Sequence, residues 1–136
     1  MHASESIFFL LAKADQAASR FWKARLAPLG VTTTQALVLA FLQAEDHIRA
    51  ASLGQRLLLD SATLTGVLRR LEARGLVARR KDTEDRRSSG VCLTPSGRAL
   101  GMRIAADMQQ AEAVFIERLT VGENNQLRAA LAKLPP

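Results

Sequence analysis

Residues 57–100 decide the fold, and they read LLLDSATLTGVLRRLEARGLVARRKDTEDRRSSGVCLTPSGRAL. Together with the residues just before them, they predict a short helix over 51–58, a tight turn, and a second helix over 61–74. Asp60 or Ser61 supplies the side-chain oxygen that caps the second helix. The apolar positions of that helix share one face: Leu64, Val67, Leu68 and Leu71. The stretch therefore predicts a helix-turn-helix.

A β-hairpin is predicted directly after the second helix. Gly75 ends that helix, and β-like runs follow over 76–80 and 91–94. The runs are separated by 81–90, the polar stretch KDTEDRRSSG, which is typical of a hairpin with a charged tip. A two-stranded wing is therefore expected beside the helix-turn-helix.

Helices are also predicted before this region. Apolar side chains at helical spacing indicate a helix over about 4–28, where Pro28 ends it. Thr34 can cap a second helix that ends near Glu45. A short segment around Ile48 then separates this helix from the helix-turn-helix.

The C-terminal part is predicted to be helical as well. Thr94 followed by Pro95 supplies an N-cap and a proline in the first turn, and these open a helical region over 95–134. A break near Val121 and Gly122 divides a long helix from a short one. The predicted fold class is mainly α with a small β hairpin: a winged helix-turn-helix with flanking N- and C-terminal helices.

The positive charge is concentrated in the middle of the chain. The 136 residues suit a single domain over 1–136, with 19 Lys and Arg against 13 Asp and Glu, a net charge of +6. Residues 49–98 hold eleven bases and five acids, so this third accounts for the whole excess. A basic patch on an otherwise neutral chain indicates a nucleic-acid partner. A solvated basic face without a ligand is the alternative that charge alone leaves open.

Several protein classes are excluded by what the sequence lacks. One cysteine, Cys92, cannot form an intramolecular disulfide, and two histidines leave too few ligands for a structural zinc site. There is no tyrosine, no GxxxxGK loop and no HExxH motif, so we expect no enzyme, no cofactor and no metal. No apolar run approaches the roughly 20 residues that span a bilayer, and the N-terminus carries Glu5 where a signal peptide has basic residues. We therefore expect no membrane partner and a cytoplasmic, nucleoid-associated protein.

The second helix has an outward face suited to double-stranded DNA. Such a helix fits the major groove, where hydroxyl and guanidinium groups reach bases and phosphates. Small side chains at Ala62 and Gly66 permit a close approach. The residues predicted to contact DNA are Ser61, Thr63, Thr65, Arg69, Arg70, Arg74, Arg86 and Arg87.

The wing tip provides the second arm of the predicted DNA contact. Asp85 lies two residues before Arg87 and can hold its guanidinium in one orientation. Less rotamer entropy is then lost when the arginine enters a narrow minor groove. A surface ion pair of little energetic value is the alternative.

At these residues the sequence resembles the MarR family of bacterial transcriptional regulators. The segment 57–100 is similar to that family's recognition helix, its wing and the entry to its dimerisation helix. The most specific parts of the resemblance are Asp85-x-Arg87 and Thr94-Pro95-x-Gly97.

The resemblance implies a homodimer that binds a pseudo-palindromic operator, with repression relieved by a small ligand or by oxidation. It assigns the DNA-binding lobe to about 34–94 and the dimerisation helices to about 4–28 and 95–134. Two positions depart from the family pattern. Gly66 stands where arginine or proline is frequent, and Arg69 stands where a polar or acidic residue is more frequent.

The resemblance also implies an effector pocket where the outer helices meet the DNA-binding lobe. The candidates for contact with a small aromatic effector are Phe8, Phe21, Trp22 and Phe41. Ordinary core packing is the alternative for each of these aromatic side chains.

Cys92 and His47 each have a functional and a structural interpretation. Relatives that sense peroxide carry their cysteine near the first helix, whereas Cys92 lies in the second predicted wing strand, where burial as a small hydrophobic residue is commoner. His47 follows Glu45 and Asp46, which suggests a metal ligand, but a loop histidine beside acids is more often solvated. We therefore expect neither an oxidant sensor nor a metal site.

Three functions compete for this sequence. The leading hypothesis is a DNA-binding repressor or activator without catalytic activity. The second hypothesis is a winged helix that binds another protein. The positively charged side chains Arg69, Arg70 and Arg74 argue against it. A small enzyme is the third, and no catalytic constellation supports it.

Overall fold

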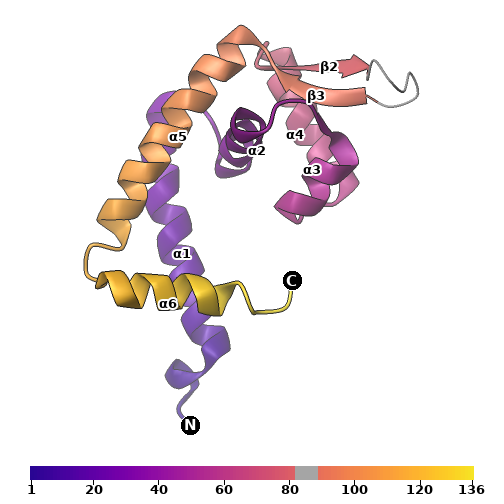
Figure 1. Cartoon of the computed structure of the whole chain (residues 1–136). Coiled ribbons are helices and arrows are strands. Elements are labelled where there is room, and N and C mark those ends of the chain that lie inside the picture. Colours follow the sequence, from indigo (N-terminus) through magenta and orange to yellow (C-terminus); the bar gives the residue numbers. More distant parts are fainter. Residues whose placement is uncertain (82–88) are drawn as a thin grey trace.

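The computed structural model describes residues 1–81 and 89–136. The chain is mostly helical and carries one small sheet (Figure 1). The elements in chain order are η1 (Ala3–Glu5), α1 (Ile7–Leu26), η2 (Ala27–Leu29), α2 (Thr33–Ala44), β1 (Ile48–Arg49), α3 (Ala50–Leu57), α4 (Ser61–Ala73), β2 (Val77–Lys81), β3 (Ser89–Leu93), α5 (Pro95–Phe115) and α6 (Val121–Leu131).

The start of α2 differs from the predicted one. Thr32 accepts a hydrogen bond from the Gln35 N–H at 3.1 Å, and the Gln35 side chain accepts one from the Thr32 N–H at 3.1 Å. The cap predicted at Thr34 is therefore wrong, because this reciprocal pair fixes the helix start two residues earlier.

The division between the last two helices also lies earlier than predicted. α5 ends at Phe115, and Thr120 caps α6 by accepting a hydrogen bond from the Glu123 N–H at 3.2 Å. The break predicted near Val121 and Gly122 is wrong, because the Thr120 cap makes these two residues the first turn of α6.

The sheet has three antiparallel strands in the order β1-β3-β2. The predicted hairpin is confirmed, with Val77 of β2 opposite Leu93 of β3. The segment around Ile48, predicted only as a separator, forms the third strand and places Ile48 opposite Val91. A strand of two residues is too short to show the alternation that marks a strand in sequence.

The core is centred on α2. Val38, Leu39 and Leu42 have no exposed surface, and burying each contributes about 1.5 to 3 kcal/mol relative to exposure. Helix α2 packs against α5, α4 and β3. The side chains buried in the same core include Leu68, Leu71, Val91 and Ile104. Because α4 and the base of the wing share this core, packing brings them together.

The two ends of the chain extend away from this core (Figure 1). They expose large apolar side chains: Ile7, Phe8, Phe9 and Leu10 on α1, Val114 and Phe115 at the end of α5, and Val121, Leu127 and Leu131 on α6. No single helix among the described residues is long and apolar enough to cross a membrane, and the pair Ile7–Leu29 and Thr33–Ala44 reaches that length only across a 76° bend. Clustered apolar exposure of this kind marks an interaction surface.

Candidate nucleic-acid interface

Asp60 fixes the start of α4. Its Oδ1 accepts a hydrogen bond from the Thr63 N–H at 2.7 Å, and its Oδ2 accepts one from the Thr63 hydroxyl at 2.9 Å. These two hydrogen bonds hold the pKa of Asp60 below its ordinary value. Since the inner face of α4 is buried through Leu64, Leu68 and Leu71, the outer face is presented in one orientation.

The predicted hydroxyl residues Ser61, Thr63 and Thr65 are all exposed on α4. The Thr63 hydroxyl donates to Asp60, and the Thr65 hydroxyl donates to the Ser61 carbonyl oxygen at 2.7 Å. Because their hydrogens are used within the helix, the two threonine oxygens are left as acceptors. In the major groove, acceptors suit the amino groups of adenine and cytosine.

The donors on this face are Arg69 and Arg70. Both are exposed, and neither forms a side-chain hydrogen bond or ion pair with another residue of 1–81 or 89–136. A Cβ atom on Gly66 would meet no atom outside its own stretch of helix backbone within 4 Å, so the surface beside the arginines is open. This face can therefore come close to a partner of opposite charge.

Arg74 has a different environment from the other predicted contacts. Its Nη1 donates to the Gly30 carbonyl oxygen at 2.7 Å, which ties the end of α4 to the connection between α1 and α2. Gly30 has a φ of 69°, a left-handed conformation that glycine adopts without strain. Arg74 thus anchors α4, and its contact with DNA stays a prediction.

The wing adds further basic side chains on β2. Arg80 and Lys81 are exposed, while Arg79 Nε donates to Glu72 Oε1 at 3.1 Å and so ties β2 to α4. The predicted tip residues lie outside the described part of the chain, and their roles stay predictions: Asp85, Arg86 and Arg87.

A close-packed joint, residues 93–98, connects the wing to α5. Thr94 Oγ1 donates to the Gly75 carbonyl oxygen at 2.6 Å, and the Thr94 N–H donates to the Leu76 carbonyl oxygen at 3.1 Å. A Cβ atom on Gly97 would overlap that same Leu76 oxygen. The Thr94-Pro95-x-Gly97 pattern therefore has a physical cause, because only glycine fits where the first turn of α5 meets the Leu76 backbone between α4 and β2.

Asp46 and Arg98 were not predicted as functional residues. The Arg98 Nη2 donates to Asp46 Oδ2 at 2.9 Å, although 52 positions separate the two residues. Local periodicity carries no signal for a pair so distant in sequence. In the sequence, Asp46 stands out only as one of the two acidic residues before His47.

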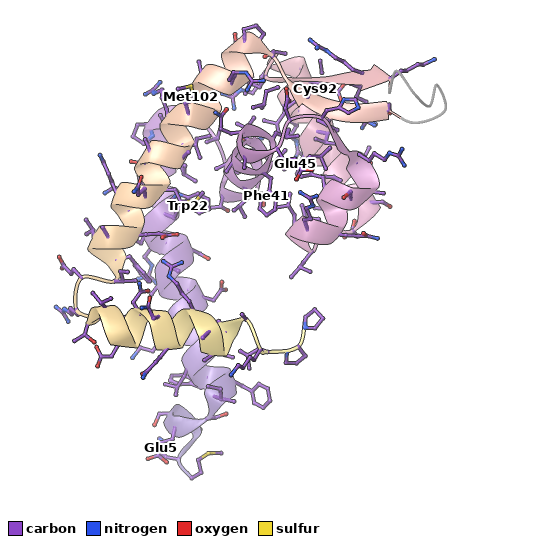
Figure 2. All side chains as sticks on the ribbon, in the orientation of Figure 1. Glu5, Trp22, Phe41, Glu45, Cys92 and Met102 are labelled. Atoms are coloured by element: carbon purple, nitrogen blue, oxygen red, sulfur yellow. The ribbon has the colours of Figure 1, made fainter. Side chains whose placement is uncertain are left out.

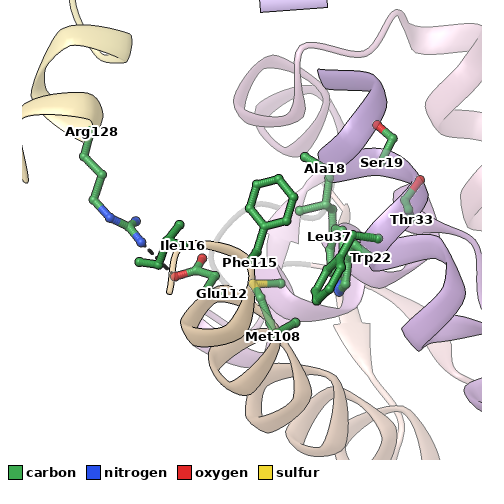
Figure 3. Close-up of a pocket in the computed structure, with 12 residues that line it drawn as sticks. Ala18, Ser19, Trp22, Thr33, Leu37, Met108, Glu112, Phe115, Ile116 and Arg128 are labelled. Carbon is green, nitrogen blue, oxygen red and sulfur yellow. Dashed lines mark hydrogen bonds and ion pairs between the residues drawn. The ribbon is translucent and has the colours of Figure 1, made fainter. Parts of the chain in front are cut away.

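A cavity of about 460 Å³ lies between α1, α2 and α5 (Figure 3). The rings of Phe21 and Phe115 are 5.4 Å apart on its wall, and Trp22 lines it with a buried Nε1 that has no hydrogen-bond partner among the described residues. At the edge, Arg128 of α6 donates to Glu112 at 2.9 Å. The remaining apolar wall includes Leu37, Met108, Ala111 and Ile116.

Two of the four predicted pocket residues do not line this cavity. Phe8 is 82% exposed and lies thirteen positions before Phe21, about 20 Å along the same helix. Phe41 is half-buried and packs against the core (Figure 2). Their contact with an effector stays a prediction, because an apolar helix position looks the same in sequence whether it faces a cavity, the core or solvent.

Cys92 is buried, as expected from its strand. It is 4% exposed, and burial raises the pKa of its thiol, which disfavours the thiolate that reacts with peroxide. The His47 Nδ1 lies 3.2 Å from the Cys92 Sγ. Among the described residues there is no group of three or more His, Cys, Asp or Glu that could hold a metal ion. That Cys92 has no role as an oxidant sensor stays a prediction.

Comparison with known proteins matches this chain to a family. The MarR family model matches residues 31–89. The HTH-type transcriptional regulator TtmR of Methylorubrum extorquens is 41% identical over 92 residues, 68% of this chain, and the match spans about half, 47%, of that relative. The organic hydroperoxide resistance transcriptional regulator of Bacillus subtilis is 34% identical over 100 residues, 74% of this chain and 68% of its own.

A solved structure extends the likeness to nearly the whole chain. This structure is of BpsR from Bordetella bronchiseptica, whose DNA binding is regulated by 6-hydroxynicotinic acid. The two structures superpose with a TM-score of 0.89 at 30% sequence identity, and the match covers 98% of this chain and 95% of the BpsR chain. The predicted winged helix-turn-helix fold is confirmed.

Proposed function

This chain belongs to the MarR family of transcriptional regulators, and on that basis we propose that it binds a specific operator in double-stranded DNA as a ligand-responsive repressor. The observation that supports this most is the outer face of α4. There, the hydroxyl oxygens of Thr63 and Thr65 lie on the same exposed surface as two arginines that have no hydrogen-bond or ion-pair partner among the described residues. The buried face of α4 holds this surface in one orientation. Such a face reads base edges in the major groove. We propose no catalytic activity and a place of action at the nucleoid.

Gel retardation of a fragment from the promoter of the protein's own gene tests this function. We expect the fragment to be retarded in the presence of excess scrambled DNA, and aromatic acids drawn from a panel to restore its mobility. Retardation that scrambled DNA abolishes would indicate only non-specific charge attraction. No retardation of either DNA would favour the alternative of a protein-docking module.

We propose that the chain acts as a homodimer through its two ends. One winged lobe covers one half-site, and two lobes must be held about 34 to 36 Å apart to read successive major grooves. Apart from Leu58 and Met102, the exposed large apolar side chains lie away from the lobe, near the N-terminus and in α1, at and after the end of α5, and in and after α6. A second copy would cover this surface, and Phe8 would then be a dimer contact.

Light scattering at micromolar concentration should give twice the 14.8 kDa mass of the chain. Phe8→Asp should shift the mass toward the monomer, because it places a charge in the apolar contact. Asp15→Asn, a change at an exposed polar position of the same helix, serves as the control and should leave the dimer intact. A wild-type mass of 14.8 kDa would contradict the proposal.

The cavity supports a small aromatic effector. Its wall is formed mainly by aromatic and aliphatic side chains, which is typical of sites for small apolar or aromatic ligands. Because α1, α2 and α5 all line the cavity, a ligand there would contact both the outer helices and the helix at the centre of the lobe. The aromatic acids in the retardation assay probe this class of ligand.

A further inference from the structure

The loop between α2 and β1 contacts the wing at several points. Asp46 Oδ1 accepts a hydrogen bond from the Leu93 N–H at 3.1 Å, and Asp46 Oδ2 accepts one from Arg98 at 2.9 Å. Leu93 is the last residue of β3, and Arg98 lies in the first turn of α5. One carboxylate therefore binds both sides of the joint at which the wing strand becomes the long helix.

The joint is held on a second side by the end of α4. Thr94 donates to the carbonyl oxygens of Gly75 and Leu76, directly after α4. Residues 93–98 are thus fixed between the end of α4 and the loop that follows α2. The direction of β3 relative to α5 depends on both attachments.

His47, the next residue of the loop, holds β3 closer to the tip. It has a φ of 63°, unusual for a residue with a side chain, and its ring occupies the space beside Gly90, where a Cβ atom would lie 2.6 Å from the ring. Its Nδ1 also lies 3.2 Å from the Sγ of Cys92. Asp46 and His47 together contact β3 near both of its ends.

The carboxylate of Asp46 is ionised at neutral pH. Burial raises its pKa, but hydrogen bonds from the Leu93 backbone, the Arg98 side chain and the His47 backbone outweigh burial and leave the pKa below its ordinary value. The two charge-assisted contacts of Asp46 are therefore present under the conditions in which the protein works.

The neighbouring acid makes a different contact. Glu45 pairs with Arg56 of α3, with Nη1 and Oε2 2.6 Å apart, and both side chains are exposed. Glu45 therefore carries the same charge one residue away, but its partner lies on α3. It provides a matched control for Asp46.

We propose that Asp46 is a positioning residue for DNA binding: by fixing the joint, its carboxylate sets the direction of the wing relative to α4, so that both reach one duplex together. This inference rests on the proposed function and adds a residue that does not itself touch DNA. Without the Asp46 contacts the chain still folds around the α2 core, but the wing is no longer directed toward the groove beside α4.

A double-mutant cycle tests the proposal. Operator affinity is measured by fluorescence anisotropy for wild type, Asp46→Ala, Arg87→Ala, the double variant and Glu45→Ala, with thermal unfolding recorded for each. We expect Asp46→Ala to weaken operator binding about tenfold, and Glu45→Ala less than about twofold. Where Arg87 is already alanine, Asp46→Ala should weaken operator binding less than about twofold, because the wing has no Arg87 contact left to lose when its direction changes.

Each other outcome overturns the proposal in a distinguishable way. An equal loss from Asp46→Ala in both backgrounds would show that Asp46 only stabilises the fold. Wild-type affinity in Arg87→Ala would show that the wing does not touch DNA, although the regulator function would stand. No operator binding by the wild type would remove the proposed function and this inference together. If Asp46→Ala does not fold, Arg98→Ala takes its place in the cycle with the same expectations.

Discussion

Replacing Gly97 with alanine is expected to lower the free energy of unfolding by about 3 kcal/mol. A Cβ atom at this position would overlap the backbone carbonyl oxygen of Leu76, which no rotamer change can move aside. That oxygen also accepts the Thr94 N–H at 3.1 Å, so shifting it breaks a second contact of the joint. For a chain of this size, thermal unfolding should show a midpoint about 10 °C lower.

Gly66→Ala is the matched control, since it makes the same change at another helical glycine. A Cβ atom there would meet nothing within 4 Å, and alanine favours a helix interior over glycine by about 1 kcal/mol. Gly66→Ala should therefore unfold at the wild-type temperature or above it. Equal midpoints for wild type and Gly97→Ala would show that α5 does not approach the Leu76 backbone as closely as described.

Arg70→Ala is expected to weaken operator binding by about 1 to 3 kcal/mol and to reduce discrimination at one base pair. Arg70 is exposed on α4 and forms no side-chain hydrogen bond or ion pair with another described residue, so its loss should leave stability nearly unchanged. Anisotropy titrations on the operator and on its single-base variants measure this. Arg118→Ala, an exposed arginine in the turn after α5, is the control and should bind like wild type.

Replacing the wing arginine, Arg87, is expected to weaken DNA binding in a different way. Arg87→Ala should weaken binding to all sequences and reduce the slope of log affinity against log salt by about one, because an arginine among phosphates releases a counterion. Asp85→Ala should give a weaker form of the same loss. An unchanged salt slope in Arg87→Ala would contradict the assignment of the wing.

The sequence predicted the start of α4 and the start of α5 well because both begin on local signals. Asp60 caps α4, and Thr94 with Pro95 opens α5, as the residue types indicate. These signals depend on neighbours within four positions of each other. They can therefore be read without knowledge of tertiary contacts.

The contacts that shape the wing and the cavity could not be predicted in this way. Asp46 meets its partners 47 and 52 positions later, and β1 is recognisable only because Val91 lies opposite Ile48. Phe8 is 82% exposed and does not line the cavity, and sequence spacing alone cannot distinguish a side chain that faces a cavity from an exposed one.

The central claim is that α4 and the wing read a specific DNA sequence, and one anisotropy titration tests it most directly. The wild-type protein is titrated onto the promoter segment that it protects and onto a scrambled duplex of equal length, at several salt concentrations. We predict that the operator binds about 10³-fold or more tightly than the scrambled duplex at physiological salt, and that part of this preference is lost in Arg70→Ala. Equal affinity for the two duplexes at every salt concentration would contradict the account.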